Sequence, residues 1–123
     1  MKFDLQKPTG QKLFTGYGNG YLMVNNVRYE RSLVVTPERV IDDWPATGFD
    51  ELGMSHFEYL RALKPAIVLL GSGAALRFPR PEFTRCLAED RIGLEVMDTA
   101  AACRTYNILM AEGRNVVAAV LLA

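Results

Sequence analysis

The chain has 123 residues, a length typical of one domain, so we expect residues 1–123 to form a single domain. Half of the residues are hydrophobic and 23% are charged, as in ordinary globular proteins. The 14 basic and 14 acidic residues balance, which argues against nucleic acid as a partner. No apolar run is long enough to span a bilayer, and residues 1–8 lack the apolar segment of a signal peptide. The sequence therefore predicts a cytoplasmic protein without membrane insertion.

Cysteine and histidine are too scarce to suggest a metal centre. Cys86 and Cys103 lie in predicted helices beside small or apolar residues, which is typical of buried free thiols in a reducing compartment. His56 is the single histidine, and we expect it to be exposed on the first turn of a helix. Without a Cys/His cluster or a Ser-His-Asp arrangement, the sequence predicts no metal, no cofactor and no catalytic residue.

Short strands and turns are expected up to about Trp44. Residues 21–24 and 27–30 flank Asn25-Asn26, and asparagine tolerates the positive φ that a two-residue hairpin turn needs. Further strands are predicted over residues 32–36 and 40–41. Trp44 has two interpretations, an exposed anchor for a partner or a side chain buried over the sheet.

From Ser55 onward the pattern alternates between helix and strand. Ser55 and Glu58 have the spacing of a capping box, Met54 and Tyr59 that of a hydrophobic staple, and Pro65 ends the helix. The apolar run 66–70 predicts a buried strand, and Pro81 predicts the start of a helix that reaches about residue 90. A strand over 92–96, a helix from Asp98-Thr99 to about residue 112 and a buried strand over 116–122 complete the pattern. The inward side chains of that last helix are expected at Ala101, Thr105, Ile108 and Leu109.

This order predicts an α/β fold with three layers and a mixed central sheet. Antiparallel N-terminal strands are followed by strand-helix-strand-helix-strand. We expect strands 66–70 and 92–96 to form a parallel pair at the centre, joined by a right-handed crossover.

Several segments of the second half resemble a known family. They are Leu70-Gly-Ser-Gly73, Glu95-Val-Met-Asp-Thr99, Ala102-Cys-Arg-Thr-Tyr-Asn-Ile-Leu109 and Glu112-Gly-Arg114. Together they resemble the small family that includes mitochondrial complex I assembly factor 3 and the adipogenesis-associated homologue of animals. The resemblance implies a three-layer α/β fold and, from the eukaryotic member, a role in assembly through protein contacts.

The best candidate site follows from the predicted topology, because ligands gather beyond the carboxyl ends of parallel strands. Glycines allow close approach of backbone N–H groups, and a helix N-terminus favours an anion. The candidate ligand-binding residues are Gly71, Ser72, Gly73, Asp98, Thr99 and Arg77. The alternative is that the glycines only form a tight turn and the polar groups only cap a helix. The run Gly16-Tyr-Gly-Asn-Gly20 is a weaker candidate, because a strand follows it.

Glu95 stands alone in an otherwise apolar predicted strand. An ion pair with Arg104 or Arg114 is one interpretation, and an acid/base couple with Asp98 is another. The third is a solvated side chain on a half-exposed strand.

Two function hypotheses remain. The first is a non-enzymatic, assembly-factor-like module that binds a protein partner or a second copy of itself. The second is a small-molecule or anion-binding protein, or an enzyme, that uses the crevice at Gly71–Gly73 and Asp98-Thr99.

Overall fold

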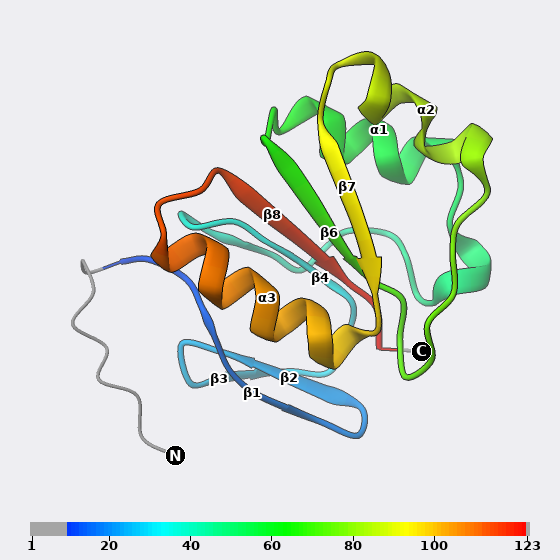
Figure 1. The fold of residues 1–123 in the computed structure, drawn as a ribbon. Helices are drawn as coiled ribbons and strands as arrows, with labels where there is room; N and C mark the ends of the chain where they lie inside the picture. The colour runs from blue at the N-terminus through cyan, green and yellow to red at the C-terminus, as the bar shows by residue number, and fades with distance from the viewer. Residues whose placement is uncertain (1–9, 123) are drawn as a thin grey trace.

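The structure is a computed structural model that describes residues 10–122 (Figure 1). Its strands are β1 (Phe14–Gly18), β2 (Tyr21–Val24), β3 (Val27–Tyr29), β4 (Leu33–Val35), β5 (Val40–Ile41), β6 (Ile67–Gly71), β7 (Gly93–Met97) and β8 (Val116–Val120). Its helices are α1 (Met54–Ala62), α2 (Pro81–Glu89) and α3 (Thr99–Ala111), with a short 3₁₀ turn, η1, at Phe49–Glu51. The expected succession of helices and strands from β2 onward is confirmed.

A five-stranded sheet in the order β5-β4-β8-β6-β7 forms the centre of the molecule. It is mixed, as predicted, because β6 runs parallel to β7 and β8 whereas β4 runs antiparallel to β8. Every residue of β8 is buried, which explains its continuous Val/Ala sequence. The predicted parallel pair is present, but β7 lies at the edge. After α3 the chain passes back across β6 and adds β8 on the other side.

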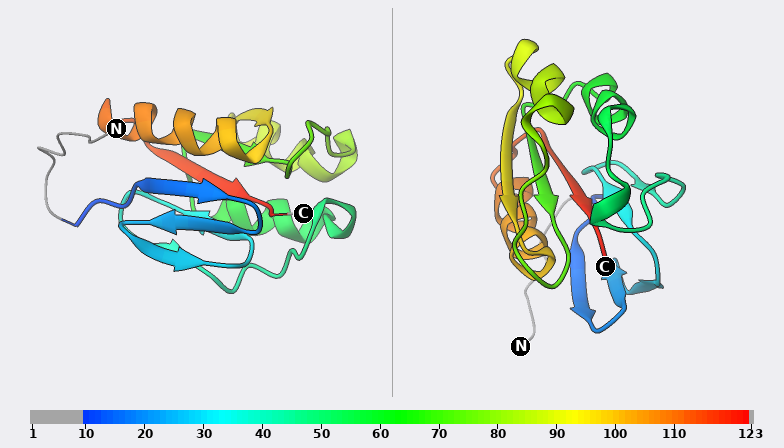
Figure 2. Two further views of the ribbon diagram at one scale, coloured as in Figure 1. Left: turned by 90° about the horizontal axis from the view of Figure 1, so that it is seen from below. Right: turned by 90° about the vertical axis from the view of Figure 1, so that its right-hand side faces the viewer.

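Layers of helix and sheet cover both faces of the central sheet (Figure 2). On one face α1 and α2 contribute Phe57, Leu60 and Leu87 to a core with Val68 and Leu70. On the other face α3 and the three-stranded sheet β1-β2-β3 pack together against the alternate residues of the same strands. The alternation of side chains along β6 thus divides the core in two. The predicted three-layer α/β fold is confirmed.

The predicted hairpin turn is confirmed at Asn25 and Asn26, whose φ angles are 49° and 67°. The sequence analysis missed β1, whose Phe-Thr-Gly-Tyr-Gly sequence contains two residues that weaken strands. Its partner β2 pairs with it in an antiparallel ladder that has an irregularity between Phe14 and Gly16. Tertiary pairing therefore overrides a poor local propensity.

The predicted cap of α1 is wrong by two positions. The helix begins at Met54 after Gly53, and the Gly53 N–H donates to Nδ1 of His56 at 3.0 Å. Met54 is 56% exposed and Tyr59 is also exposed, so the expected hydrophobic staple does not form. The imidazole of His56 therefore caps the start of α1, the role that the sequence pattern had predicted for Ser55 and Glu58.

The inward face of α3 differs in part from the prediction, since Leu109 packs against the core as expected but Ile108 does not. Its buried residues are Thr99, Ala102, Cys103, Tyr106 and Met110, whereas Ile108 is 59% exposed. The ring of Tyr106 packs edge-on against Phe14, with centroids 5.4 Å apart. The helix is therefore rotated toward the small sheet, a partner that the sequence analysis had not placed beside it.

Candidate functional site

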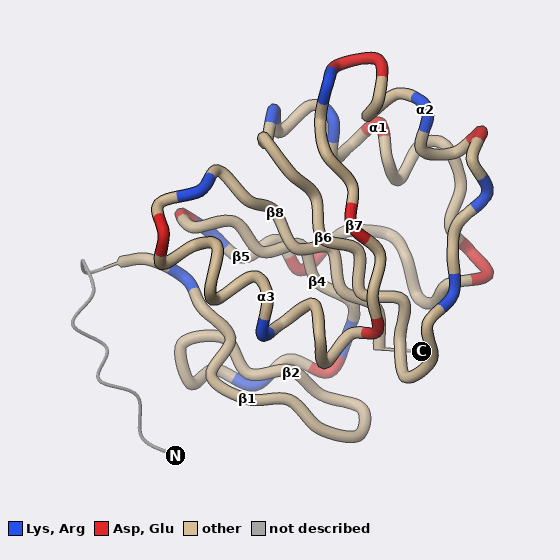
Figure 3. The backbone as a smooth tube through the Cα atoms, viewed as in Figure 1, with Lys and Arg blue, Asp and Glu red and all other residues tan. Residues whose placement is uncertain are grey.

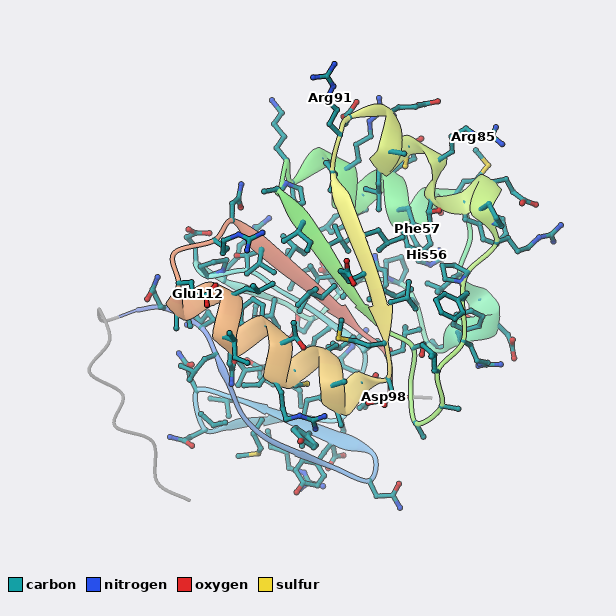
Figure 4. All side chains as sticks on the ribbon, viewed as in Figure 1. His56, Phe57, Arg85, Arg91, Asp98 and Glu112 are labelled. Carbon is teal, nitrogen blue, oxygen red and sulfur yellow. The ribbon has the colours of Figure 1, made fainter. Side chains whose placement is uncertain are left out.

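A hollow of about 270 Å³ lies where the carboxyl ends of the parallel strands meet the β1–β2 turn. Its walls come from four parts of the chain: Tyr17 to Leu22, Gly73 and Ala74, Asp98 to Ala100, and Leu121 and Leu122. Figure 4 shows Asp98 at the end of β7, where α3 begins. The topology thus builds a depression at the place where α/β sheets commonly bind ligands.

The turns after β6 and β7 lie side by side, joined by backbone hydrogen bonds. The Ser72 N–H donates to the Met97 carbonyl and the Thr99 N–H donates to the Gly73 carbonyl, each at 2.9 Å. The Gly73 N–H donates to Thr99 Oγ1, also at 2.9 Å. These three bonds occupy three of the N–H groups expected to meet an anion, and they join the two strand ends to each other.

The space around position 71 has no room for a side chain larger than that of glycine. A Cβ at position 71 would lie 2.9 Å from Thr99 Oγ1, closer than real Cβ atoms approach, and 3.0 Å from Val120 Cγ1, tighter than most real Cβ contacts. The same Thr99 hydroxyl donates to the Leu121 carbonyl at 2.5 Å. Thr99 therefore binds the ends of β6 and β8 to the start of α3, and Gly71 leaves the room that this junction needs.

Ser72 shapes the loop that leads from β6 to α2. Its side chain is buried, and its hydroxyl donates to the Ala75 carbonyl at 2.7 Å and accepts the Arg77 N–H at 3.1 Å. A weaker contact of 3.2 Å joins the same hydroxyl to the Met97 carbonyl. The hydroxyl thus serves the fold of the loop, and Ser72 is not among the residues that line the hollow.

Arg77 points away from the hollow. Its guanidinium lies 4.4 Å from the centre of the Phe49 ring and 3.3 Å from a carboxylate oxygen of Asp50. Of the six predicted ligand-binding residues, only Gly73, Asp98 and Thr99 line the hollow. Asp98 uses one carboxylate oxygen to cap α3, accepting the Ala101 N–H at 2.9 Å.

The structure places the predicted ion-pair residues apart. Glu95 is exposed on the edge strand β7, and within residues 10–122 no ion pair joins it to Arg104 or Arg114. Arg104 instead donates to the hydroxyl of Tyr17 at 2.7 Å, which raises the pKa of the guanidinium further. Arg114 is exposed in the turn before β8. Since α3 covers the middle of the sheet, its arginine meets β1 rather than β7.

The sequence analysis undervalued the turn between β1 and β2. The run Gly16-Tyr-Gly-Asn-Gly20 was the weaker candidate because a strand follows it, yet this turn forms a whole wall of the hollow. Gly20 has a φ of 79°, which the turn requires. The closely spaced glycines indicated a tight turn. The position of this turn opposite α3, however, depends on packing between distant parts of the chain.

Other singled-out side chains have roles in the core. Cys86 and Cys103 are buried free thiols on opposite faces of the sheet, as predicted, and burial raises the pKa of Cys103 to about 12. Trp44 is buried and its indole stands edge-on to the ring of His56. His56 is half-buried rather than exposed. Within residues 10–122, no three His, Cys, Asp or Glu side chains gather as metal ligands would.

Comparison with known proteins identifies relatives over most of the chain. An uncharacterised protein of Rhodobacter capsulatus is 35% identical, over 86% of this chain and 81% of the relative. The "13 kDa major membrane protein" of Francisella tularensis is 26% identical, over 94% and 95%. The bovine NADH dehydrogenase (ubiquinone) 1 alpha subcomplex assembly factor 3 is 29% identical over 85% of this chain, which spans only 58% of the bovine protein.

Solved structures share the fold. A crystal structure of a Bordetella parapertussis protein is 39% identical and has a TM-score of 0.88, over 95% of this chain and all of that one. A Bordetella pertussis Mth938-like domain is 34% identical with a TM-score of 0.83, over 98% and 92%. An outer membrane protein of Bartonella henselae is 27% identical with a TM-score of 0.75, over 92% and 96%. In this chain, none of the helices between residues 10 and 122 has the length and apolarity to cross a membrane.

A family model agrees with these relatives. The model described as "Protein of unknown function (DUF498/DUF598)" matches residues 14–121, nearly the whole chain. The bovine and human assembly factor 3 proteins match 85% and 95% of this chain. The chain therefore belongs to the DUF498/DUF598 family, with the assembly factor 3 proteins among its homologues and the Mth938-like domains as its structural neighbours.

Proposed function

We propose that this protein is an assembly-factor-like module that binds a partner protein through the loop between β6 and α2. The observation that carries the proposal is the display of two large apolar side chains on this loop. Leu76 is 53% exposed and Phe78 is 68% exposed, and Phe78 is the most exposed large hydrophobic residue in the described part of the chain. Side chains of this kind form the centres of protein interfaces.

The loop that carries them is held in place. The Ser72 hydroxyl bonds to Ala75 and Arg77 at its start, and Arg77 lies against Phe49 and Asp50. At its end the guanidinium of Arg80 lies 5.6 Å from the centre of the Phe83 ring and bonds to Glu82 at 3.0 Å. A loop that is already ordered loses less conformational entropy on binding than a flexible loop, and this favours affinity.

The three consecutive residues Leu76, Arg77 and Phe78 are all exposed, but their side chains lie in different surroundings. Arg77 is turned onto the protein, while its two neighbours, Leu76 and Phe78, face solvent. Covering the exposed parts of both would contribute about 1–2 kcal/mol for each side chain, before the costs of association. Neither side chain belongs to the two core clusters of the described residues, so both are available to a partner surface.

The relatives support a role in assembly. Assembly factor 3 proteins from cattle, frog, fly, human and mouse all match this chain, and their name states that they assist assembly of a subcomplex of NADH dehydrogenase. We extend only the general role to this chain: transient contact with a subunit of a larger complex. We expect that contact to take place in the cytoplasm.

Photo-crosslinking in the source cell tests the proposal. A benzoylphenylalanine at position 78 should yield one dominant crosslinked protein, whereas the same group at position 108, also exposed but on α3, should not. Phe78→Ser and Leu76→Ser should remove the partner from the purified protein with little change in melting temperature. The proposal fails if positions 78 and 108 give the same products, or none.

A second candidate function rests on the hollow beside α3. Its volume suits a small metabolite, and it combines the Asp98 carboxylate with backbone groups of the β1–β2 turn. A fragment screen by NMR should then shift the amide signals of Gly18, Gly20 and Ala100. Ala100→Phe, which fills the hollow, should abolish those shifts. Fragments that move only signals elsewhere would eliminate this candidate.

A further inference from the structure

The outer edge of β7 offers a free row of backbone hydrogen-bonding groups. Among the strands of residues 10–122, β7 lies at the edge and pairs with β6 alone. The Gly93 N–H donates to the Ala66 carbonyl, and the Met97 carbonyl accepts the Ser72 N–H, so Gly93, Glu95 and Met97 turn their backbone groups toward β6. The N–H and C=O groups of Leu94 and Val96 consequently point outward. Within residues 10–122 no hydrogen bond uses them.

This edge lacks most of the devices that protect sheet edges. Proteins usually shield an edge strand by shortness, proline, a bulge or charge. β7 has the same five-residue length as its neighbour β6, pairs with it in an unbroken register and contains no proline. Its one charged residue is Glu95, the red segment on β7 in Figure 3.

The two faces of β7 differ in chemistry. Leu94 and Val96 point toward α2, where they lie partly buried against the core that contains Leu87. Glu95 points to the opposite face of the strand, where it is exposed. No ion pair within residues 10–122 compensates its charge. A strand added at this edge would therefore contact apolar side chains on one face of the sheet and the Glu95 carboxylate on the other.

Charge argues against a second copy of this chain as the added strand. The symmetric antiparallel register that satisfies all four free groups pairs Leu94 with Val96 of the second copy. It also places Glu95 directly opposite Glu95, with Cα atoms about 4.5 Å apart. Like charges in opposed positions are destabilising. The edge is better matched by a segment with a basic residue at that position.

We propose that the edge of β7 binds an extended segment of a partner protein by strand addition, with a lysine or arginine opposite Glu95 and apolar residues on either side. Four main-chain hydrogen bonds at Leu94 and Val96 would supply affinity, and the cation opposite Glu95 would supply selectivity. An opposite-charge pair at this position should favour the basic segment about two- to fivefold. This contact is separate from Leu76 and Phe78, so it does not depend on the proposed function of that loop.

A pair of matched peptides tests the proposal on the intact protein. The first is a nine-residue peptide with the centre Val-Lys-Val between threonines, and the second has Val-Glu-Val at the same place. In NMR titrations the first peptide should shift the Leu94 and Val96 amide signals and bind at least twofold more tightly. Glu95→Lys should reverse that preference, and Phe78→Ser should leave it unchanged.

A second variant removes the edge without touching the ladder to β6. Proline is tolerated where the replaced N–H faces solvent, so Val96→Pro should keep the fold but lose the peptide. Three results would overturn the proposal. They are the same peptide preference in Glu95→Lys as in the parent, shifts confined to other elements, or a dimer of the parent chain that Val96→Pro dissociates, which would identify a second copy as the occupant.

Discussion

The side-chain amide of Asn107 pairs with both backbone groups of Phe14, although 93 residues separate them. Asn107 Oδ1 accepts the Phe14 N–H at 2.9 Å and Nδ2 donates to the Phe14 carbonyl at 2.7 Å. The amide thus pairs with Phe14 on the outer side of β1, opposite the side on which β2 pairs with it. One side chain of α3 satisfies a strand end and joins the small sheet to the helix.

Replacing this amide should loosen the junction. Asn107→Ala leaves a backbone donor and acceptor of Phe14 unpaired, so we expect the free energy of unfolding to fall by about 1–3 kcal/mol. Urea denaturation measures the loss, and hydrogen exchange should show faster exchange of the Phe14 amide. Ile108→Ala, the exposed neighbour, serves as the control and should change stability by less than about 0.5 kcal/mol. Equal effects of the two variants would contradict the bridging role.

Gly71 should tolerate no side chain. Gly71→Ala would press a methyl group against Thr99 and Val120, both in the packed core, and should destabilise the protein by about 1–3 kcal/mol. Gly93→Ala is the matched control, because its Cβ would lie 3.6 Å from Ile67, an ordinary contact. Thermal melting of the two variants should therefore separate them clearly, and a stable Gly71→Ala protein would refute the packing argument.

His56 should carry its ring proton on Nε2. Nδ1 accepts the Gly53 N–H, and Nε2 lies 3.0 Å from the Pro45 carbonyl, which only a donor can satisfy. Long-range ¹H–¹⁵N NMR spectra should show this tautomer. His56→Ala leaves the Gly53 N–H unpaired and should cost about 1–3 kcal/mol, with a red shift of Trp44 fluorescence. Ser55→Ala should hardly change the free energy of unfolding, since Ser55 does not cap α1. A large loss of stability in this variant would instead support the cap predicted from the sequence.

Ionisation of Cys103 should weaken the fold in alkaline solution. Burial raises its pKa from 9.0 to about 12, so between these values the unfolded chain loses a proton that the folded chain keeps. The stability from the neutral buried thiol is therefore fully present below pH 9 and declines as the pH rises toward 12. Cys103→Ala should show a shallower decline over this range in urea denaturation. Parallel curves for the variant and the parent would rule out this contribution.

The rate of alkylation independently tests whether the Cys103 thiol is buried. In Cys86→Ala, Cys103 is the remaining thiol, and at pH 8.5 it should react with iodoacetamide much more slowly in the native protein than in urea. Fast alkylation of the native protein would mean that the thiol is accessible.

Local patterns in the sequence were sufficient for most elements. Asn25-Asn26 marks a hairpin because both residues accept a positive φ, and Pro81 and Gly113 mark helix ends because of their backbone preferences. The apolar runs of β6 and β8 indicate burial on both faces. The proximity of the turns after β6 and β7 also followed from topology, and the hydrogen bonds of Ser72 and Thr99 bear it out.

The tertiary structure alone decided how these pieces face one another. No local signal places β8 between β4 and β6, and that placement leaves β7 at the edge with Glu95 exposed. Likewise, no local signal turns Tyr106 toward Phe14 or the β1–β2 turn toward Asp98. Backbone preferences act over a few residues, so they can be predicted from short stretches of sequence. Side-chain partners are chosen by long-range packing, which depends on the whole chain at once.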